Sequence, residues 1–151
     1  FLQMLYASRY RGVSSYQRYI ENQIKKHKQL TCASGNTRIF LGRTNDHSTI
    51  QAAYSHEPQG NTTYATNLAM RNLWYDEENL EPSGSYIIQP LHSVHDALCG
   101  QFPIDRAEWA TRRIPLYFNN PITVRGITLT IPFEGHYGKF WGDESGGEIK
   151  L

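Results

Sequence analysis

The sequence has little cysteine, almost no net charge and no long apolar run. Its two cysteines, Cys32 and Cys99, lie far apart without CxxC spacing, which argues against a disulfide framework and against a zinc finger. We therefore expect both thiols to be reduced and mostly buried. The net charge of +1 excludes a strongly basic surface of the kind that duplex-binding proteins use. Because no run reaches the length of a membrane span and no signal peptide is recognisable, we expect a cytoplasmic protein that does not enter a membrane.

The chain is rich in aromatic residues and short enough for one domain or one large subdomain. Its 151 residues include ten tyrosines, whose flat apolar rings with a polar tip suit partly wet surfaces and clefts. The first residue is Phe1, and residues 1–6 have the composition of a helix interior without a preceding cap. We expect the chain to begin inside a longer protein and to carry an apolar face there that needs a partner.

Hydrophobic spacing predicts an α+β fold, with helices packed on a small antiparallel sheet. Ser14 and Gln17 have capping-box spacing, which predicts a helix from Ser14 to about residue 28. Gly35-Asn36 is a turn signal, and it predicts a small hairpin over residues 30–41. A helix over 47–75 follows, and Pro58 should kink or restart it, since proline removes a backbone donor.

The second half of the sequence predicts a hairpin, a helix and one strand. The hairpin extends over residues 86–102. Asp105 and Glu108 have the spacing of an N-cap and its third helical residue, so a helix should follow to about residue 118. Residues 127–131 alternate strictly between apolar and polar types, which predicts a half-buried strand. The glycine-rich tail after Pro132 is expected to be irregular.

The bend of the second hairpin is the most informative position for chemistry. His95, Asp96 and Ala97 are expected to form it, and a carboxylate at a hairpin tip is accessible to a hard cation such as Mg²⁺. Spacing alone also fits an ordinary turn-forming aspartate. His92, His95, Asp96 and Cys99 could suggest zinc, but their spacing matches no finger pattern and alternate strand positions face opposite ways.

Two further segments are weaker candidates for a functional site. Gln59 follows Pro58 on the long helix, and its amide could donate to the acceptors of a nucleic-acid minor groove. Taken alone, this segment equally fits a kinked helix with polar residues in water. The segment Glu134–Gly138 follows the alternating strand, and we assign it no chemistry.

Three motifs in a fixed order resemble the end of family A (polymerase I-like) DNA polymerases, most closely the phage-type members. They are Pro58-Gln59-Gly60, Val94-His95-Asp96 and Gly138-Lys139-Phe140-Trp141. The similarity extends from about Tyr6 to Gly142, so that residues 1–151 would form the C-terminal segment of the polymerase palm. The upstream palm, the fingers and the thumb would then lie outside this sequence.

The resemblance implies a role for each matching residue. Asp96 corresponds to a catalytic aspartate that binds the metal ions, and His95 to a histidine that contacts the primer end. Gln59 corresponds to a glutamine that touches the minor groove near the primer terminus. The implied cofactor is Mg²⁺ in a two-metal site, and the implied partners are primer–template DNA, a dNTP and the missing N-terminal portion. The implied location is the cytoplasm of a bacterium or of a phage-infected cell.

The sequence departs from the family pattern at three positions. Ala97 follows the His-Asp pair where the family often has Glu, an auxiliary group in catalysis. Ser55 and Gln51 stand where the family often has Asn and Arg. These two positions are candidate DNA contacts, and the grip on the primer strand is expected to differ in detail.

One catalytic carboxylate cannot hold two metal ions. The resemblance places the other aspartate and the nucleotide-binding fingers helix upstream of Phe1, so we expect no polymerase activity from this chain alone. One alternative is a non-catalytic module that binds DNA or a partner chain, derived from a split or degenerate polymerase. Another is a small metal-dependent nuclease that uses Asp96 and His95.

Overall fold

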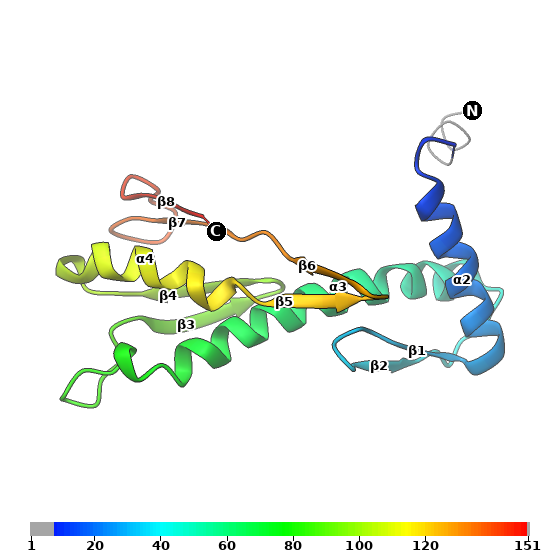
Figure 1. Cartoon of the computed structure of the whole chain (residues 1–151), viewed down its shortest axis with the longest axis horizontal. Helices are drawn as coiled ribbons and strands as arrows, with labels where there is room; N and C mark the ends of the chain where they lie inside the picture. The colour runs from blue at the N-terminus through cyan, green and yellow to red at the C-terminus, as the bar shows by residue number, and fades with distance from the viewer. Residues whose placement is uncertain (1–7, 151) are drawn as a thin grey trace. The chain divides into compact units, whose positions relative to one another are not determined.

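The computed structural model describes residues 8–150 and divides the chain into two compact units, Phe1–Asn61 and Thr62–Leu151. Within the described residues it contains three α-helices and four antiparallel sheets of two strands each (Figure 1). The α+β prediction is therefore confirmed, whereas the single small sheet is replaced by four separate hairpins. Each strand pairs with the next strand along the chain, so every sheet forms from local contacts. The predicted apolar face at residues 1–6 lies outside the described residues.

The first unit begins with helix α2, Arg11–His27, and its predicted capping box is wrong. The helix starts three residues before Ser14, and its N-cap residue makes no side-chain hydrogen bond. Ser14 instead lies inside the helix, where its carbonyl accepts a hydrogen bond from Arg18 Nε at 3.4 Å. Lys28 ends the helix in a left-handed conformation with a φ of 52°.

Strands β1, Gln29–Thr31, and β2, Thr37–Ile39, form the predicted first hairpin. The hydroxyls of Thr31 and Thr37, which are register partners, lie 2.8 Å apart. The core of the unit combines buried apolar residues from α2, the hairpin segment and helix α3, His47–Trp74. Its members are Ile20, Ile24, Leu30, Phe40 and Ala53.

Helix α3 runs through Pro58 without a restart. Proline has no N–H, so residue 58 cannot donate to the carbonyl of Tyr54 four residues earlier. The hydroxyl of Tyr16 on α2 donates to that carbonyl at 2.9 Å. A side chain from another helix thus satisfies the acceptor that Pro58 leaves without its helical donor, which explains how the helix tolerates an interior proline.

The second unit is built from the C-terminal part of α3, strands β3, Gln89–Val94, and β4, Ala97–Gln101, and helix α4, Ala107–Phe118. Figure 1 shows α4 beside the β3–β4 hairpin. The buried cluster here comprises Ala69, Leu73, Ile88, Ala110 and Tyr117.

Asn79 joins two of these elements from inside the unit. It ends the short 3₁₀ helix η1, Glu77–Asn79, and is completely buried. Its amide oxygen accepts from Ile88 N at 2.7 Å, and its amide nitrogen donates to Ile88 O at 3.0 Å. A buried side chain that exchanges two hydrogen bonds with one residue fixes the chain just before β3 against the end of α3.

The predicted cap of α4 is also wrong. Asp105 lies in a second 3₁₀ helix, η2, Ile104–Arg106, and the N-cap residue of α4 is Arg106, which makes no side-chain capping bond. Pro115 is inside α4. As in α3, one proline does not end a helix whose apolar face is packed.

The last two hairpins differ most from expectation. Strands β5, Pro121–Val124, and β6, Ile127–Thr130, meet at an Arg125-Gly126 turn in which both residues have positive φ, as a type I′ turn requires. β6 is exposed along its whole length rather than half-buried. The tail also forms a hairpin instead of irregular chain, with β7, Glu134–Tyr137, and β8, Gly147–Lys150.

Candidate functional site: the β3–β4 hairpin and its surroundings

The structure places His95 and Asp96 at the predicted bend, as the two residues of a tight turn, whereas Ala97, which we also expected in the bend, is the first residue of β4. Val94 and Ala97 pair directly on either side of them. His95 has a φ of 53°, a left-handed conformation that histidine adopts more often than most residues other than glycine. Both side chains are exposed, so the carboxylate and the imidazole are open to a ligand.

A hydrogen bond from helix α3 holds this turn. The hydroxyl of Thr66 donates to the backbone carbonyl of Asp96 at 3.0 Å and to its own helix at Thr62 O at 3.2 Å. Thr66 is buried, so the contact is shielded from water and fixes the turn against the helix. The Asp96 carboxylate is left outside this contact, available to bind a cation.

Asp96 lies outside the cluster of potential metal ligands that the described residues form. Across residues 8–150, the carboxylates, imidazoles and thiols that gather in groups of three or more do not include Asp96 or His95. Any second carboxylate for a two-metal site would have to come from elsewhere.

The candidate DNA contacts on α3 lie on one helix face. Gln51, Ser55 and Gln59 are spaced four residues apart, and continuity of the helix through Pro58 keeps them in register. Gln51 and Gln59 are exposed. Ser55 is partly buried, and its hydroxyl donates to Gln51 O at 3.0 Å, so this hydroxyl is engaged with its own helix. The side-chain amides exposed on this face are therefore those of Gln51 and Gln59.

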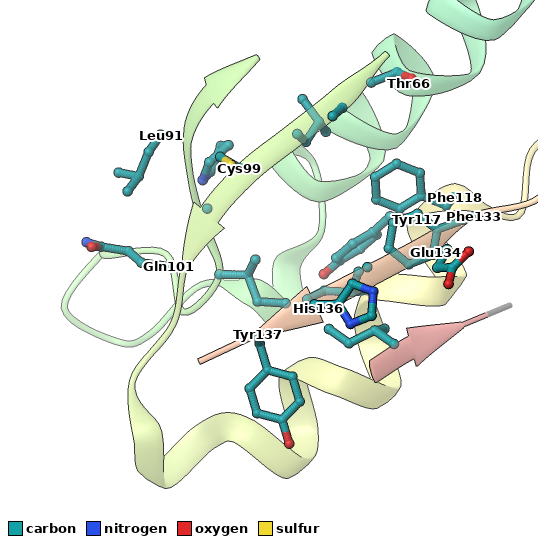
Figure 2. Close-up of a pocket in the computed structure, with 18 of the residues that line it drawn as sticks. Thr66, Leu91, Cys99, Gln101, Tyr117, Phe118, Phe133, Glu134, His136 and Tyr137 are labelled. Carbon is teal, nitrogen blue, oxygen red and sulfur yellow. The ribbon is translucent and has the colours of Figure 1, made fainter. Parts of the chain in front are cut away.

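A cavity of about 960 Å³ lies within the second unit, and Asp96 and Thr66 belong to its lining. Figure 2 shows Tyr117 and Phe118 from α4 and Phe133 from the segment before β7 around it. The rings of Phe118 and Phe133 are stacked with centroids 4.0 Å apart. The aromatic wall provides apolar contact area close to the hairpin turn.

An ion pair contacts Tyr117, one of the residues of this aromatic wall. Arg113 donates two hydrogen bonds of 2.8 Å to the two carboxylate oxygens of Asp76, and Tyr117 OH donates to Asp76 Oδ2 at 2.5 Å. Hydrogen bonding from Arg113, followed by that from Tyr117, lowers the pKa of Asp76. Burial and the bond to Asp76 raise the pKa of Tyr117. The tyrosine therefore stays a neutral donor that orients the α4 side of the cavity.

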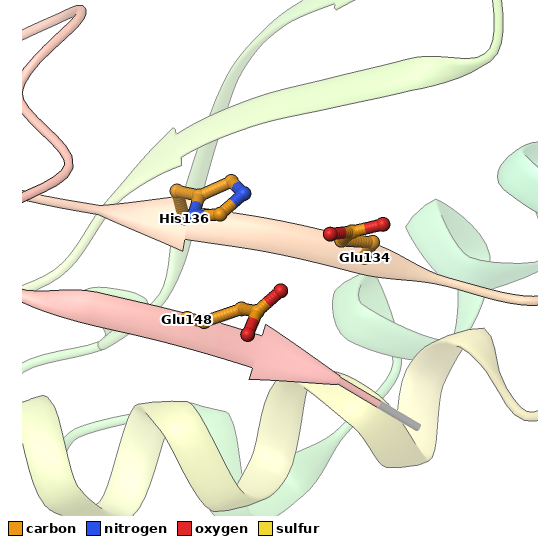
Figure 3. A group of neighbouring side chains, drawn as sticks. All are labelled: Glu134, His136 and Glu148. Carbon is orange, nitrogen blue, oxygen red and sulfur yellow. The ribbon is translucent and has the colours of Figure 1, made fainter.

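The structure also brings together three residues that the sequence interpretation left without a role. Ligand atoms of Glu134, His136 and Glu148 all lie within 4.8 Å of one another (Figure 3). A hydrogen bond from Lys150, the largest cause, lowers the pKa of Glu148. The Glu-x-His alternation of residues 134–136 was visible in the sequence, but its partner strand was not, because we expected an irregular tail.

Comparisons with known proteins give no relative: no family model, no curated protein and no solved structure matches the chain. Within residues 8–150, no helix combines the length and apolar character needed to span a membrane.

Proposed function

We propose that this chain is the C-terminal palm segment of a family A DNA polymerase, which supplies one metal-binding aspartate and primer-terminus contacts to template-directed nucleotidyl transfer in DNA replication. The observation that carries the proposal is the Val94-His95-Asp96 motif at a two-residue hairpin turn, with an exposed carboxylate. The turn is held within the second unit by the buried Thr66.

In this role Asp96 binds Mg²⁺ through its carboxylate oxygens, the ligands that this hard cation prefers. The bound ions would lower the pKa of the primer 3′-hydroxyl and stabilise charge on the phosphate. The Thr66 bond to the Asp96 carbonyl holds the backbone of the turn and involves neither oxygen of the carboxylate. Since the chain supplies one carboxylate here, the upstream portion of the polymerase would supply the other.

His95 and Gln59 would act on the DNA. The imidazole of His95 is exposed next to the metal-binding residue, where it can donate to the primer end. The exposed amide of Gln59 can donate to minor-groove acceptors of any base pair. Gln51 lies on the same helix face and would extend this contact, with Ser55 contributing mainly through its position.

The test is primer extension in the presence of Mg²⁺, with this chain alone and with an added palm-and-fingers fragment from the upstream part of a family A polymerase. We expect extension only in the mixture. Asp96→Ala should reduce its rate at least about a thousandfold, or ~4 kcal/mol of transition-state stabilisation, while DNA affinity changes little. Asp105→Ala is the matched control, because it removes another exposed aspartate of the same unit.

Other outcomes would redirect the assignment. Extension that survives Asp96→Ala would refute the role of this aspartate. Mg²⁺-dependent cleavage of DNA by the chain alone would favour the nuclease. Absence of extension in every mixture, with retained binding to DNA or to the upstream fragment, would favour the non-catalytic module. Its exposed neighbours Phe140 and Trp141 would then be natural docking residues.

A further inference from the structure

The outward face of the β7–β8 hairpin carries an ordered array of charged and metal-ligating side chains. Glu134 and His136 are two residues apart on β7 and therefore point to the same side. Across the ladder, His136 is paired with Glu148 and Glu134 with Lys150. The two glutamates are thus diagonal neighbours, and the imidazole lies beside both (Figure 3).

The opposite face of the hairpin holds this array in place. Ile149 is buried, and the ring of Tyr137 lies 5.8 Å from that of Phe102. The loop between the strands approaches its own backbone closely at Gly138. Any Cβ at this position would lie 2.0 Å from the carbonyl oxygen of Asp143. Asp143 in turn accepts backbone hydrogen bonds from Lys139 at 2.8 Å and Ser145 at 2.9 Å. The strands that carry the ligands are fixed at the loop and on the inner face.

We infer that Glu134, His136 and Glu148 form a binding site for a first-row transition-metal dication such as Zn²⁺, which would join β7 to β8. Ligand atoms from all three residues already lie within 4.8 Å of one another, so that small rotations of exposed side chains suffice to surround one ion. One imidazole and two carboxylates are ligands that Zn²⁺ uses, with water completing the coordination. Imidazole favours such a metal over Mg²⁺, which prefers oxygen ligands alone.

Lys150 is the internal competitor for this site. Its Nζ lies 2.6 Å from Glu148 Oε1, so that the ammonium now offsets the repulsion between the two neighbouring carboxylates. A dication would take over this function, and Lys150 would move into water, where its side chain is already more than half exposed. This competition distinguishes a metal site from a simple cross-strand ion-pair cluster. The inference does not depend on the proposed polymerase role.

The experiment is calorimetric titration of the full chain with Zn²⁺, followed by hydrogen exchange of the β7 and β8 amides. We expect one Zn²⁺ to bind and to slow exchange in both strands. Mutation of a group that only hydrogen-bonds to a metal ligand typically weakens metal binding roughly tenfold or more. Removal of a ligand itself should cost at least as much, so His136→Ala and Glu148→Gln should each weaken Zn²⁺ binding by at least that factor. Glu144→Gln, which changes an exposed acid between the two strands, should leave the affinity unchanged.

The sharpest variant is Lys150→Ala, which should tighten Zn²⁺ binding because it removes the competing cation. Weaker or unchanged binding in Lys150→Ala would overturn the inference, as would full affinity in His136→Ala. Zn²⁺ that binds without slowing exchange in β7 and β8 would lie elsewhere, for instance at Cys32, and would also overturn it. Displacement of Zn²⁺ by an equal concentration of Mg²⁺ would show that His136 does not select the metal, and would overturn the inference as well. Far-ultraviolet circular dichroism verifies that each variant is folded.

Discussion

The hydrogen bond between Tyr16 and the Tyr54 carbonyl gives a prediction that can be worked out in detail. We expect Tyr16→Phe to lower the free energy of unfolding by about 1–2 kcal/mol, the usual cost of leaving a partly buried acceptor without its donor. The bond is 2.9 Å long and joins residues 38 positions apart, so the whole cost belongs to tertiary structure. Urea unfolding followed by circular dichroism at 222 nm, a standard helix signal, measures it.

The cause can be isolated with Pro58→Ala. Alanine restores an amide N–H at position 58, which can donate to the Tyr54 carbonyl within the helix. In that background Tyr16→Phe should cost only about 0.5 kcal/mol, because the acceptor keeps a donor. The double-mutant cycle should therefore give a coupling of about 1 kcal/mol. Pro58→Ala by itself should stabilise the chain, since proline is unfavourable inside a helix.

Tyr75→Phe is the matched control, because it removes the hydroxyl of a tyrosine that is 73% exposed. It should change stability by less than about 0.5 kcal/mol. An equal cost of Tyr16→Phe with proline and with alanine at position 58 would refute the explanation that Tyr16 compensates for the proline.

Two further predictions concern ionisable groups. Asp76→Ala should lower stability by about 3 kcal/mol in urea unfolding, because Arg113 loses a partner in a mostly buried ion pair, while the exposed Asp105→Ala should have little effect. Because the folded pKa of Asp76 lies below its ordinary value of 3.8, its contribution should be present above that pH and be lost as pH falls through the lowered pKa. Burial and a hydrogen bond to Glu21 raise the pKa of Tyr54 to about 12, so Tyr54 should be among the late-ionising tyrosines in tyrosinate absorbance, together with Tyr117, whose pKa is also raised. Glu21→Gln should lower the pKa of Tyr54 and leave that of Tyr117 unchanged. The contribution of Tyr54 to the free energy of unfolding is complete below pH 10 and should decline between about pH 10 and pH 12. A Tyr54 that titrates near pH 10 would contradict the environment described for it.

Local signals in the sequence determined much of the second hairpin and the candidate site. The position of the bend at His95 and Asp96 was predicted because strand-forming residues flank residues that tolerate tight turns, although Ala97 belongs to β4 and not to the bend. The three residues at positions 51, 55 and 59 share a face because four-residue spacing repeats nearly once per helical turn. The polymerase resemblance depends on the same local motifs, and its functional content stays a prediction until extension is measured.

Helix boundaries were less predictable. Ser14 and Asp105 have capping spacing, yet α2 begins before Ser14 and α4 begins after Asp105. A cap contributes only about 1 kcal/mol, and packing of an apolar helix face easily outweighs it. The sequence likewise suggested a kink or restart at Pro58, because proline removes a backbone donor.

What the sequence determined by itself is therefore local: the α+β composition, the first two hairpins and the position of the bend at His95 and Asp96. Tertiary structure alone decided that α3 is continuous, since the necessary donor is Tyr16 on another helix. It also decided that the tail is a hairpin and that Glu134, His136 and Glu148 converge. Pairing of β7 with β8 spans a glycine-containing loop, and its stability comes from burying residues such as Ile149 against the rest of the unit. Such burial depends on atoms distant in sequence, and no local pattern specifies it.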